Sequence, residues 1–333
     1  MSASLKGKSL TKELDFSAAQ FHYLLNLAAE LKAATKAGAE IQQLVGKSVA
    51  LIFEKTSTRT RAAFEVAMAQ QGGSTTVFDA ASSQIGHKES IADTAQVLSR
   101  MYDAIMYRGD LQATVETLAK NSKVPVLNGL TDAWHPTQML ADLLTMQEAS
   151  GKPLTDIKFS YVGDARNNMG NSFLITAAIL GMNFAIGAPK SLWPTAQLVA
   201  QAQQIAATTG ATLQLTEQPE AAVANSDFVH TDVWVSMGEP ESVWKSRIEQ
   251  LLPYQVNSKL FSAAAAGAKF MHCLPAYHDQ ETKVAQFAAS LTGISGGIEV
   301  TDEVFQSAAN ISFEQAENRL HTTKALLIAT ILG

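Results

Sequence analysis

The chain has 333 residues, of which 47% are hydrophobic and 17% are charged, and its formal net charge is −6. This composition is typical of a globular protein with a large buried core and excludes a disordered chain. The length favours two domains over one. The acidic balance gives no broad basic surface for nucleic acid, so any anion site must be a local cluster of Arg, Lys and backbone N–H groups.

Cysteine content and apolar runs indicate the compartment. Cys273 is the single cysteine, so no intramolecular disulfide can form, and a reducing compartment fits. Residues 1–16 lack the apolar run of a signal peptide. No apolar stretch approaches the roughly 18–20 residues of a membrane span. We therefore expect a cytoplasmic protein without a membrane partner.

The first part of the chain alternates between helical and strand patterns. Apolar residues at helical spacing and short apolar runs predict helices at 16–37, 58–71 and 137–147, and strands at 49–53, 74–78, 104–107 and 124–128. Short apolar runs of this kind are typical of buried parallel strands. Strands that alternate with helices predict an α/β domain with a parallel sheet, covering residues 1–150.

The same alternation restarts after Gly151-Lys152-Pro153. Predicted strands lie at 158–162, 183–188, 213–215, 228–231 and 269–272, with a helix at 171–180. A second domain is thus expected over residues 151–313. The last predicted helix, 314–332, has no strand after it, and its pattern allows packing on either domain. The predicted fold class is α/β, with two doubly wound parallel-sheet domains joined by long helices.

A dense polar cluster, Ser57-Thr58-Arg59-Thr60-Arg61, stands between a predicted strand and a predicted helix. Free N–H groups at a helix N-terminus attract anions, and hydroxyl and guanidinium groups complete a phosphate site. A simple helix cap is the alternative, since Ser and Thr are common there. The segment is not a Walker A loop, because GxxxxGK[ST] is absent. In open α/β sheets ligands bind beyond the carboxyl ends of strands, where this cluster lies.

Four segments resemble the aspartate and ornithine carbamoyltransferases, in the order found in that family. They are the FEKTSTRTR segment at 53–61, SQIGHKES at 83–90, YRG at 107–109 and HPTQ at 135–138. The resemblance extends over essentially the whole chain. It implies that the last helix returns to the first domain, and that a homo-oligomer built from trimers shares its active sites between subunits.

The resemblance assigns a carbamoyl phosphate site to the first domain. It implies that the phosphate is held by Ser57, Thr58, Arg59 and Thr60, and that Gln84 is supplied by the adjacent subunit. The carbonyl oxygen would be polarised and the carbamoyl group fixed by Arg108, His135 and Gln138. The remaining expected contacts are Pro136, Thr137, Cys273, Leu274 and Arg319. From the residues alone, His135 before Pro136 could simply start a helix, and Arg108 could form a surface ion pair.

Two segments of the second domain resemble the ornithine branch. Residues 164–171 and 232–238 each follow a predicted strand, and the HCLP sequence at 272–275 is that of the same branch. The implied ornithine ligands are Asn168, Asp232, Ser236 and Met237. We find no pair of cationic residues there for the second carboxylate of aspartate. Without the resemblance, the methionines would be core residues, Asp232 a cap, and Cys273 a small buried hydrophobe.

The implied reaction moves the carbamoyl group of carbamoyl phosphate to the δ-amine of L-ornithine, giving L-citrulline and phosphate. It needs neither a protein nucleophile nor a metal or cofactor. Arg108 and His135 are expected to stabilise the oxyanion, Cys273 to orient the δ-amine, and the departing phosphate to take the amine proton. Asp232 is expected to hold the α-ammonium group, far from the reacting amine.

Three other functions compete with this assignment. Another carbamoyltransferase would use aspartate, putrescine or an acylated ornithine as the acceptor. A nicotinamide dehydrogenase is disfavoured because no GxGxxG follows a predicted strand. A catalytically silent binding subunit is disfavoured because the candidate catalytic residues are all present.

Overall fold

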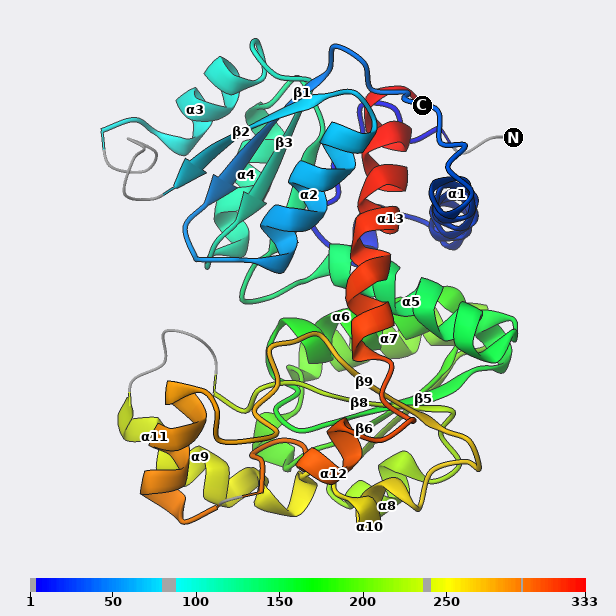
Figure 1. Ribbon diagram of the computed structural model, residues 1–333, viewed down its shortest axis with the longest axis vertical. Helices are drawn as coiled ribbons and strands as arrows, with labels where there is room; N and C mark the ends of the chain where they lie inside the picture. Colours follow the sequence, from blue (N-terminus) through cyan, green and yellow to red (C-terminus); the bar gives the residue numbers. More distant parts are fainter. Residues whose placement is uncertain (1–3, 80–87, 236–240, 295) are drawn as a thin grey trace. The chain divides into compact units, whose positions relative to one another are not determined.

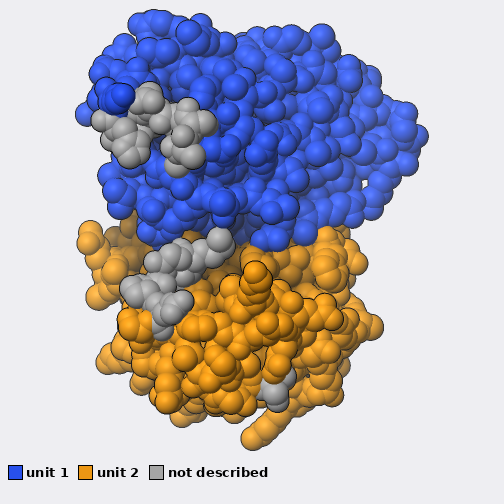
Figure 2. Space-filling view, turned by 60° about the vertical axis from the view of Figure 1, so that its left-hand side comes forward, with its two compact units in different colours: residues 1–145, 316–333 blue, residues 146–315 orange. Residues whose placement is uncertain are grey.

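A computed structural model describes residues 4–79, 88–235, 241–294 and 296–333 of the chain. The chain forms two compact units, of which unit 1 comprises residues 1–145 and 316–333, and unit 2 comprises residues 146–315 (Figure 2). Within the described ranges, no helix is both long and apolar enough for a membrane span.

Unit 1 is built on a four-stranded parallel sheet in the order β2-β1-β3-β4 (Figure 1). Its strands are β1 (Ser48–Phe53), β2 (Ser74–Asp79), β3 (Ala104–Arg108) and β4 (Val126–Leu130). Its helices are α1 (Ala18–Lys36), α2 (Arg59–Gln70), α3 (Ile91–Leu98), α4 (Gln112–Asn121), most of α5 (Pro136–Ser150) and most of α13 (Ser312–Ile331), with a short 3₁₀ turn at Glu13–Asp15. The long helices α5 and α13 each begin in one unit and end in the other.

Unit 2 is built on a five-stranded parallel sheet in the order β7-β6-β5-β8-β9. The strands are β5 (Lys158–Val162), β6 (Asn183–Gly187), β7 (Thr212–Thr216), β8 (Phe228–Thr231) and β9 (Lys269–His272). The helices are α6 (Asn168–Leu180), α7 (Ala196–Thr209), α8 (Pro219–Val223), α9 (Trp244–Leu251), α10 (Ser258–Phe261), α11 (Lys283–Thr292) and α12 (Asp302–Phe305). Short 3₁₀ turns lie at Leu154–Asp156, Lys190–Leu192, Glu241–Val243 and Leu252–Tyr254.

The strand order of each sheet reverses at one point, and these points locate the binding sites. In unit 1 the reversal lies between β1 and β3, and in unit 2 between β5 and β8. Ligands of open α/β sheets bind outside the carboxyl ends of the strands at such switch points. The segments that follow these four strands are therefore the ones expected to carry the chemistry.

The predicted fold class is confirmed, including the return of the C-terminal helix to the first sheet from Ala316 onward. Several predicted boundaries differ from the structure by one to three residues, and two of them have a clear physical reason. Strand β4 starts at Val126 instead of residue 124, because Pro125 has no N–H to donate to the ladder. Helix α6 starts at Asn168 instead of residue 171, so it includes polar residues that carry no apolar periodicity.

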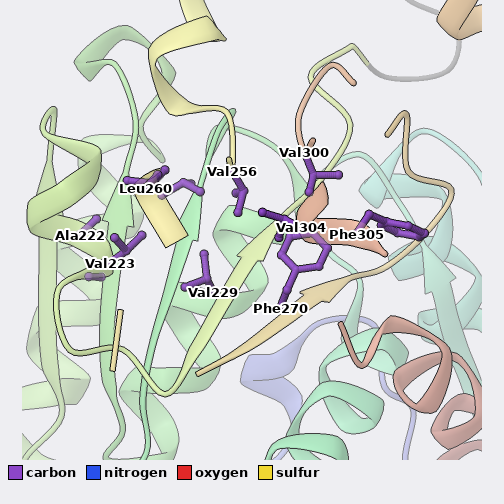
Figure 3. Packing of buried hydrophobic residues seen from close by; sticks show 11 residues of the cluster. Ala222, Val223, Val229, Val256, Leu260, Phe270, Val300, Val304 and Phe305 are labelled. Atoms are coloured by element: carbon purple, nitrogen blue, oxygen red, sulfur yellow. The ribbon is translucent and has the colours of Figure 1, made fainter. Parts of the chain in front are cut away.

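The core of unit 2 packs side chains from the sheet against the segments that cover it. One buried cluster consists of Val162, Ala185, Ala222, Val223, Val229, Val256, Leu260, Phe270, Val300, Val304 and Phe305 (Figure 3). Phe270 on β9 is fully buried among them. Phe270 is thus a large apolar side chain of this cluster, and it lies on the strand that leads to Cys273.

Replacing Phe270 by alanine should destabilise unit 2. Deletion of a buried phenylalanine ring costs about 3–5 kcal/mol through lost transfer energy and the cavity that remains. The measurement is equilibrium urea unfolding followed by tryptophan fluorescence. Phe313, which is 63% exposed, is the matched control, and its replacement by alanine should cost less than about 1 kcal/mol. Equal losses for the two variants would contradict the assignment of the core.

Candidate active site

The hydroxyl of Thr60 is the meeting point of the predicted residues in unit 1. Thr60 lies in the first turn of α2, just after β1, and is fully buried. Its Oγ1 accepts hydrogen bonds from Nη1 of Arg108 at 3.1 Å and from Nη2 of Arg319 at 2.7 Å. Arg108 ends β3, and Arg319 lies on α13, 259 residues along the chain from Thr60. Two guanidinium groups from distant segments thus converge on one hydroxyl at a strand end.

The turn between β1 and α2 presents further polar groups at the same helix N-terminus. Ser57 accepts the backbone N–H of Thr60 on its Oγ at 3.3 Å. Thr58 is the N-cap residue, but its side chain makes no capping hydrogen bond and is exposed. Capping thus accounts for Ser57 and leaves the Thr58 hydroxyl for another role. An N-terminus of this kind favours anions through its N–H groups and its dipole.

Gly129 makes room for this arrangement, and the sequence analysis did not identify it. Nη1 of Arg108 lies 3.4 Å from the carbonyl oxygen of Gly129. A Cβ atom at this glycine would come within 2.6 Å of the Met106 sulfur and 3.0 Å of the Thr60 methyl group. Any side chain here would therefore displace the groups that meet at the Thr60 hydroxyl.

His135 is held in its neutral form beside these cations. It precedes α5 and is 3% exposed. Burial lowers the pKa of His135 well below its usual value, and the charges of Arg319, Arg108 and Arg59 lower this pKa further. Thr137 places its Oγ1 at 3.4 Å from Nδ1 of His135. A hydroxyl that donates to Nδ1 leaves the ring proton on Nε2, so His135 can act as a neutral hydrogen-bond donor.

Pro136 and Gln138 belong to the first turn of α5, which starts at Pro136. The alternative that His135-Pro136 marks a helix start is therefore correct, and it does not conflict with ligand binding at the same place. Gln138 is buried and donates from Nε2 to Oδ1 of Asp142, one turn further along the helix, at 2.7 Å. The sequence analysis did not identify Asp142.

In unit 2, Asp232 and Cys273 lie against each other at the carboxyl ends of β8 and β9. The Cys273 thiol donates to Oδ1 of Asp232 with a sulfur–oxygen distance of 3.1 Å. The same carboxylate oxygen accepts the backbone N–H of Val233 at 2.8 Å. Burial raises the pKa of Asp232, and the neighbouring His272 and the Cys273 thiol oppose this shift. The sequence analysis placed these two residues at opposite ends of ornithine, so their contact is closer than expected.

A buried polar chain supports the turn that contains Cys273 and Leu274. Leu274 has a φ of 57°, in the left-handed region, and its N–H donates to Nδ1 of His272 at 2.9 Å. Nε2 of His272 lies 3.3 Å from Oε1 of Glu299, and both side chains are fully buried. Gln315 accepts the N–H of His272 at 3.0 Å. Such strain in a non-glycine residue persists only where the surroundings enforce it; the HCLP sequence indicated the turn, but nothing in the sequence indicated Glu299.

The segment after β5 contains a compact group of charges. Asp164 is 4% exposed and binds Arg166 through two hydrogen bonds, at 3.0 and 2.6 Å. Arg247, from α9, donates to the same carboxylate at 2.7 Å and to the carbonyl of Trp234 at 3.3 Å. The fold brings Arg247 beside Arg166, a pair that the sequence analysis did not identify. Both guanidinium groups are paired with Asp164, whose charge they share.

The remaining predicted residues have separate placements. Asn168 is the first residue of α6, where its side chain is half-buried. Gly170, in the same turn, approaches Ala165 so closely that a Cβ would lie 2.2 Å from the carbonyl oxygen of Ala165. Gln84, Ser236 and Met237 lie outside the described residues.

A metal ion would have one possible donor group in the part of the chain that the structure describes. Ligand atoms of Asp232, His272 and Cys273 lie within 4.8 Å of one another. Both ring nitrogens of His272 already face polar neighbours, the Leu274 N–H and the Glu299 carboxylate. Coordination would have to break one of these contacts, so we assign no metal here.

Comparison with known proteins matches a separate family domain to each of the two parts of the chain. The model of the "aspartate/ornithine carbamoyltransferase, carbamoyl-P binding domain" matches residues 8–148, and that of the "Asp/Orn binding domain" matches residues 155–330. A catabolic ornithine carbamoyltransferase of Rhizobium meliloti is 57% identical over 332 residues, 99% of each chain. The catabolic enzyme of Burkholderia mallei is 58% identical over 335 residues, 100% of each chain.

Solved structures show the same fold. The ornithine carbamoyltransferase from Pyrococcus furiosus superposes with a TM-score of 0.90 at 40% identity, covering 99% of each chain. The anabolic enzyme of Campylobacter jejuni gives 0.85 at 37% identity, covering 96% of this chain and 97% of that one. Two parallel-sheet domains with polar clusters at their switch points thus define a group-transfer enzyme. The chain belongs to the aspartate/ornithine carbamoyltransferase family, as its motifs predicted.

The lowered pKa of His135 predicts a pH-dependent stability. Below the ordinary histidine pKa of about 6.5, the unfolded chain binds a proton that folded His135 does not, so stability falls as pH drops. The loss due to this residue should reach about 1.4 kcal/mol at pH 5.5 relative to pH 8. Urea unfolding of the wild type and of His135→Gln at both pH values measures it. The variant should lose correspondingly less stability; parallel losses would refute a neutral His135.

Proposed function

We infer that the chain transfers the carbamoyl group of carbamoyl phosphate to the δ-amine of L-ornithine, giving L-citrulline and phosphate. The observation that carries this inference is the convergence of Arg108 and Arg319 on the Thr60 hydroxyl. This cluster lies in the part of the chain that the carbamoyl-P binding domain matches. The relatives at 57% and 58% identity carry the name of an ornithine carbamoyltransferase.

The phosphate group is bound at the N-terminus of α2. Ser57, Thr58, Arg59 and Thr60 supply hydroxyl, guanidinium and backbone N–H donors at the switch point of the sheet. Arginine matches the fork of a phosphate with two parallel hydrogen bonds. A dianion at this position also offsets the mutual repulsion of the arginines that meet beside it.

The carbonyl oxygen of the carbamoyl group faces donors that do not need to move during the reaction. Arg108 supplies a charged donor, and neutral His135 supplies its Nε2 proton. As the amine attacks, negative charge develops on this oxygen, and fixed donors in a water-poor site stabilise it. Because His135 stays neutral, it provides this donor without adding another full positive charge to the cluster.

Ornithine is bound by Asn168 and Asp232, together with Ser236 and Met237. Asn168, at the N-terminus of α6, donates to the α-carboxylate, and Asp232 accepts from the α-ammonium. The two nitrogens of ornithine are separated by four carbons, and they lie roughly 6 Å apart when the molecule is extended. One ornithine can therefore reach the Asp232 carboxylate with one nitrogen while the other lies beside the Cys273 thiol.

The δ-amine must lose its proton before it attacks. An alkyl amine has a pKa of about 10.4, so only roughly one molecule in 10³–10⁴ is neutral near pH 7. Desolvation and nearby cations favour the neutral form. The amine nitrogen then bonds to the carbamoyl carbon, and the C–O bond to phosphate breaks. The departing phosphate takes one proton from this nitrogen, which keeps the other. No protein nucleophile takes part.

Ornithine is favoured over aspartate by the way in which charges are paired in unit 2. The cations suited to a second carboxylate, Arg166 and Arg247, are both bound to Asp164. Citrulline formation should therefore exceed the carbamoylation of aspartate by at least about 10²-fold in kcat/KM, because these two cations are already paired. It should exceed the carbamoylation of putrescine by at least as much, because a site built for polar α-groups rejects analogues that lack them. Comparable rates with putrescine would contradict the assigned roles of Asn168 and Asp232.

Arg108→Gly should lower kcat by about 10²–10³-fold, since it removes a donor to the developing oxyanion. Thermal unfolding and far-UV circular dichroism should show that the fold is retained. Arg100→Gly is the matched control, because Arg100 is exposed and donates to the carbonyl of Gln96, four residues before it. Near-normal turnover of Arg108→Gly would reject its catalytic role.

The subunits form a trimer, or a multiple of trimers, in which Gln84 completes the site of a neighbour. The support is the resemblance of residues 83–90 to the shared loop of the family. Mixing Gln84→Ala and Arg108→Gly subunits after denaturation tests it, since random trimers would regain about a quarter of the wild-type sites only if sites are shared. Absence of regained activity in trimers shown by light scattering to contain both subunits would exclude a shared site.

The physiological direction is proposed from the relatives, which are named catabolic. In that direction the same site would split citrulline with phosphate during arginine metabolism. Steady-state rates in both directions, with saturation curves for carbamoyl phosphate, test this proposal. Strong sigmoidicity supports a regulated catabolic enzyme, and a hyperbolic curve with a low KM opposes it.

A further inference from the structure

We propose that Asp142 is a positioning residue through which the enzyme distinguishes carbamoyl phosphate from acyl phosphates that lack an NH₂ group. It acts by fixing the orientation of the Gln138 side-chain amide. The proposal rests on the carbamoyl phosphate site described above and adds a residue to it.

The two side chains form a short and buried hydrogen bond within one helix. Gln138 and Asp142 lie one turn apart on α5 and are 1% and 0% exposed. Nε2 of Gln138 donates to Oδ1 of Asp142 at 2.7 Å. Asp142 is the acceptor in this contact, so it is the NH₂ end of the Gln138 amide that faces the carboxyl group. The amide oxygen must then point to the other side.

That oxygen is a buried acceptor with an open bonding position. Oε1 of Gln138 makes no hydrogen bond with any described residue of the chain and is removed from solvent. Buried acceptors are normally satisfied, and exceptions are common where a ligand belongs. Gln138 stands in the first turn of α5, and its backbone N–H donates to the carbonyl oxygen of His135 at 3.0 Å. The acceptor thus belongs to a residue three positions after His135, whose ring is assigned above to the carbonyl oxygen of the substrate.

An acceptor at this point can distinguish two substrates of the same shape. Carbamoyl phosphate and acetyl phosphate differ only in an NH₂ group in place of a methyl group. The NH₂ group donates to Oε1, whereas the methyl group leaves Oε1 buried and unpaired, which a site of this kind penalises. If the amide were free to turn over, its own NH₂ end would face the ligand and the discrimination would weaken. Asp142 is what prevents this rotation.

The selectivity ratio tests the proposal. It is the inhibition constant of acetyl phosphate divided by the KM of carbamoyl phosphate, both from steady-state citrulline formation. Asp142→Ala should lower this ratio by about 10–100-fold, the size of effect that one lost polar contact produces. The inhibition constant of inorganic phosphate should stay within about two-fold, because the phosphate ligands are untouched. If Asp142 had only a structural role, its replacement would weaken the binding of carbamoyl phosphate, acetyl phosphate and inorganic phosphate together.

Three further variants act as controls. Asp142→Asn keeps the size of the side chain but can donate as well as accept, so it no longer fixes the Gln138 amide and should also lower the ratio. Gln138→Leu should lose the ratio, and adding Asp142→Ala to it should bring no further loss, since both act through one contact. Gln147→Ala, on the same helix and half-buried, should leave the ratio unchanged.

An unchanged ratio in a folded Asp142→Ala enzyme overturns the proposal. So does an Asp142→Asn enzyme that keeps the wild-type ratio. If Asp142→Ala does not fold, Asp142→Asn and Gln138→Leu decide: both must lower the ratio. A wild-type enzyme that makes no citrulline would refute the proposed function itself, whereas citrulline formation with unaltered selectivity would refute only the role of Asp142.

Discussion

The convergence of guanidinium groups on the buried hydroxyl of Thr60 is the constraint on which the phosphate-binding unit depends. Arg108 and Arg319 share one acceptor, and like charges this close repel each other. The same positive field, together with burial, keeps the pKa of His135 low. A dianion bound beside these arginines would offset their repulsion, so the cluster favours a phosphate group. Binding strength and the neutral state of His135 thus have a common origin.

This convergence requires that α13 be fixed firmly to the rest of unit 1. Lys324, fully buried on α13, donates to both carboxylate oxygens of Glu40 at 2.6 and 2.8 Å. Asn318, the residue directly before Arg319, accepts from buried Lys32 of α1 at 2.7 Å and donates to Thr145 of α5 at 2.9 Å. Breaking such buried pairs leaves an unpaired charge and is costly. These contacts set the position of the helix that carries Arg319.

Sequence patterns predicted the sheets and the strand-end residues, because buried parallel strands are apolar and binding sites follow their carboxyl ends. Ser57, Thr60 and Arg108 could be found in this way, and the family resemblance supplied their roles. Gly129, Arg247 and Glu299 could not, because each acts on a neighbour that only the fold brings close. Asp142 stands one helical turn from Gln138, but the sequence does not show that both side chains are buried. Asp142 reads as an ordinary polar residue on a helix, and Arg247 stands 83 residues from the Asp164 that it binds.

The two units handle charge in different ways. In unit 2 the buried carboxylate of Asp164 is bound by Arg166 and Arg247, and Nε2 of His272 lies 3.3 Å from Oε1 of Glu299. Asp232 is the carboxylate of unit 2 that we propose for a substrate ammonium group. Unit 1 instead concentrates positive charge for a dianion.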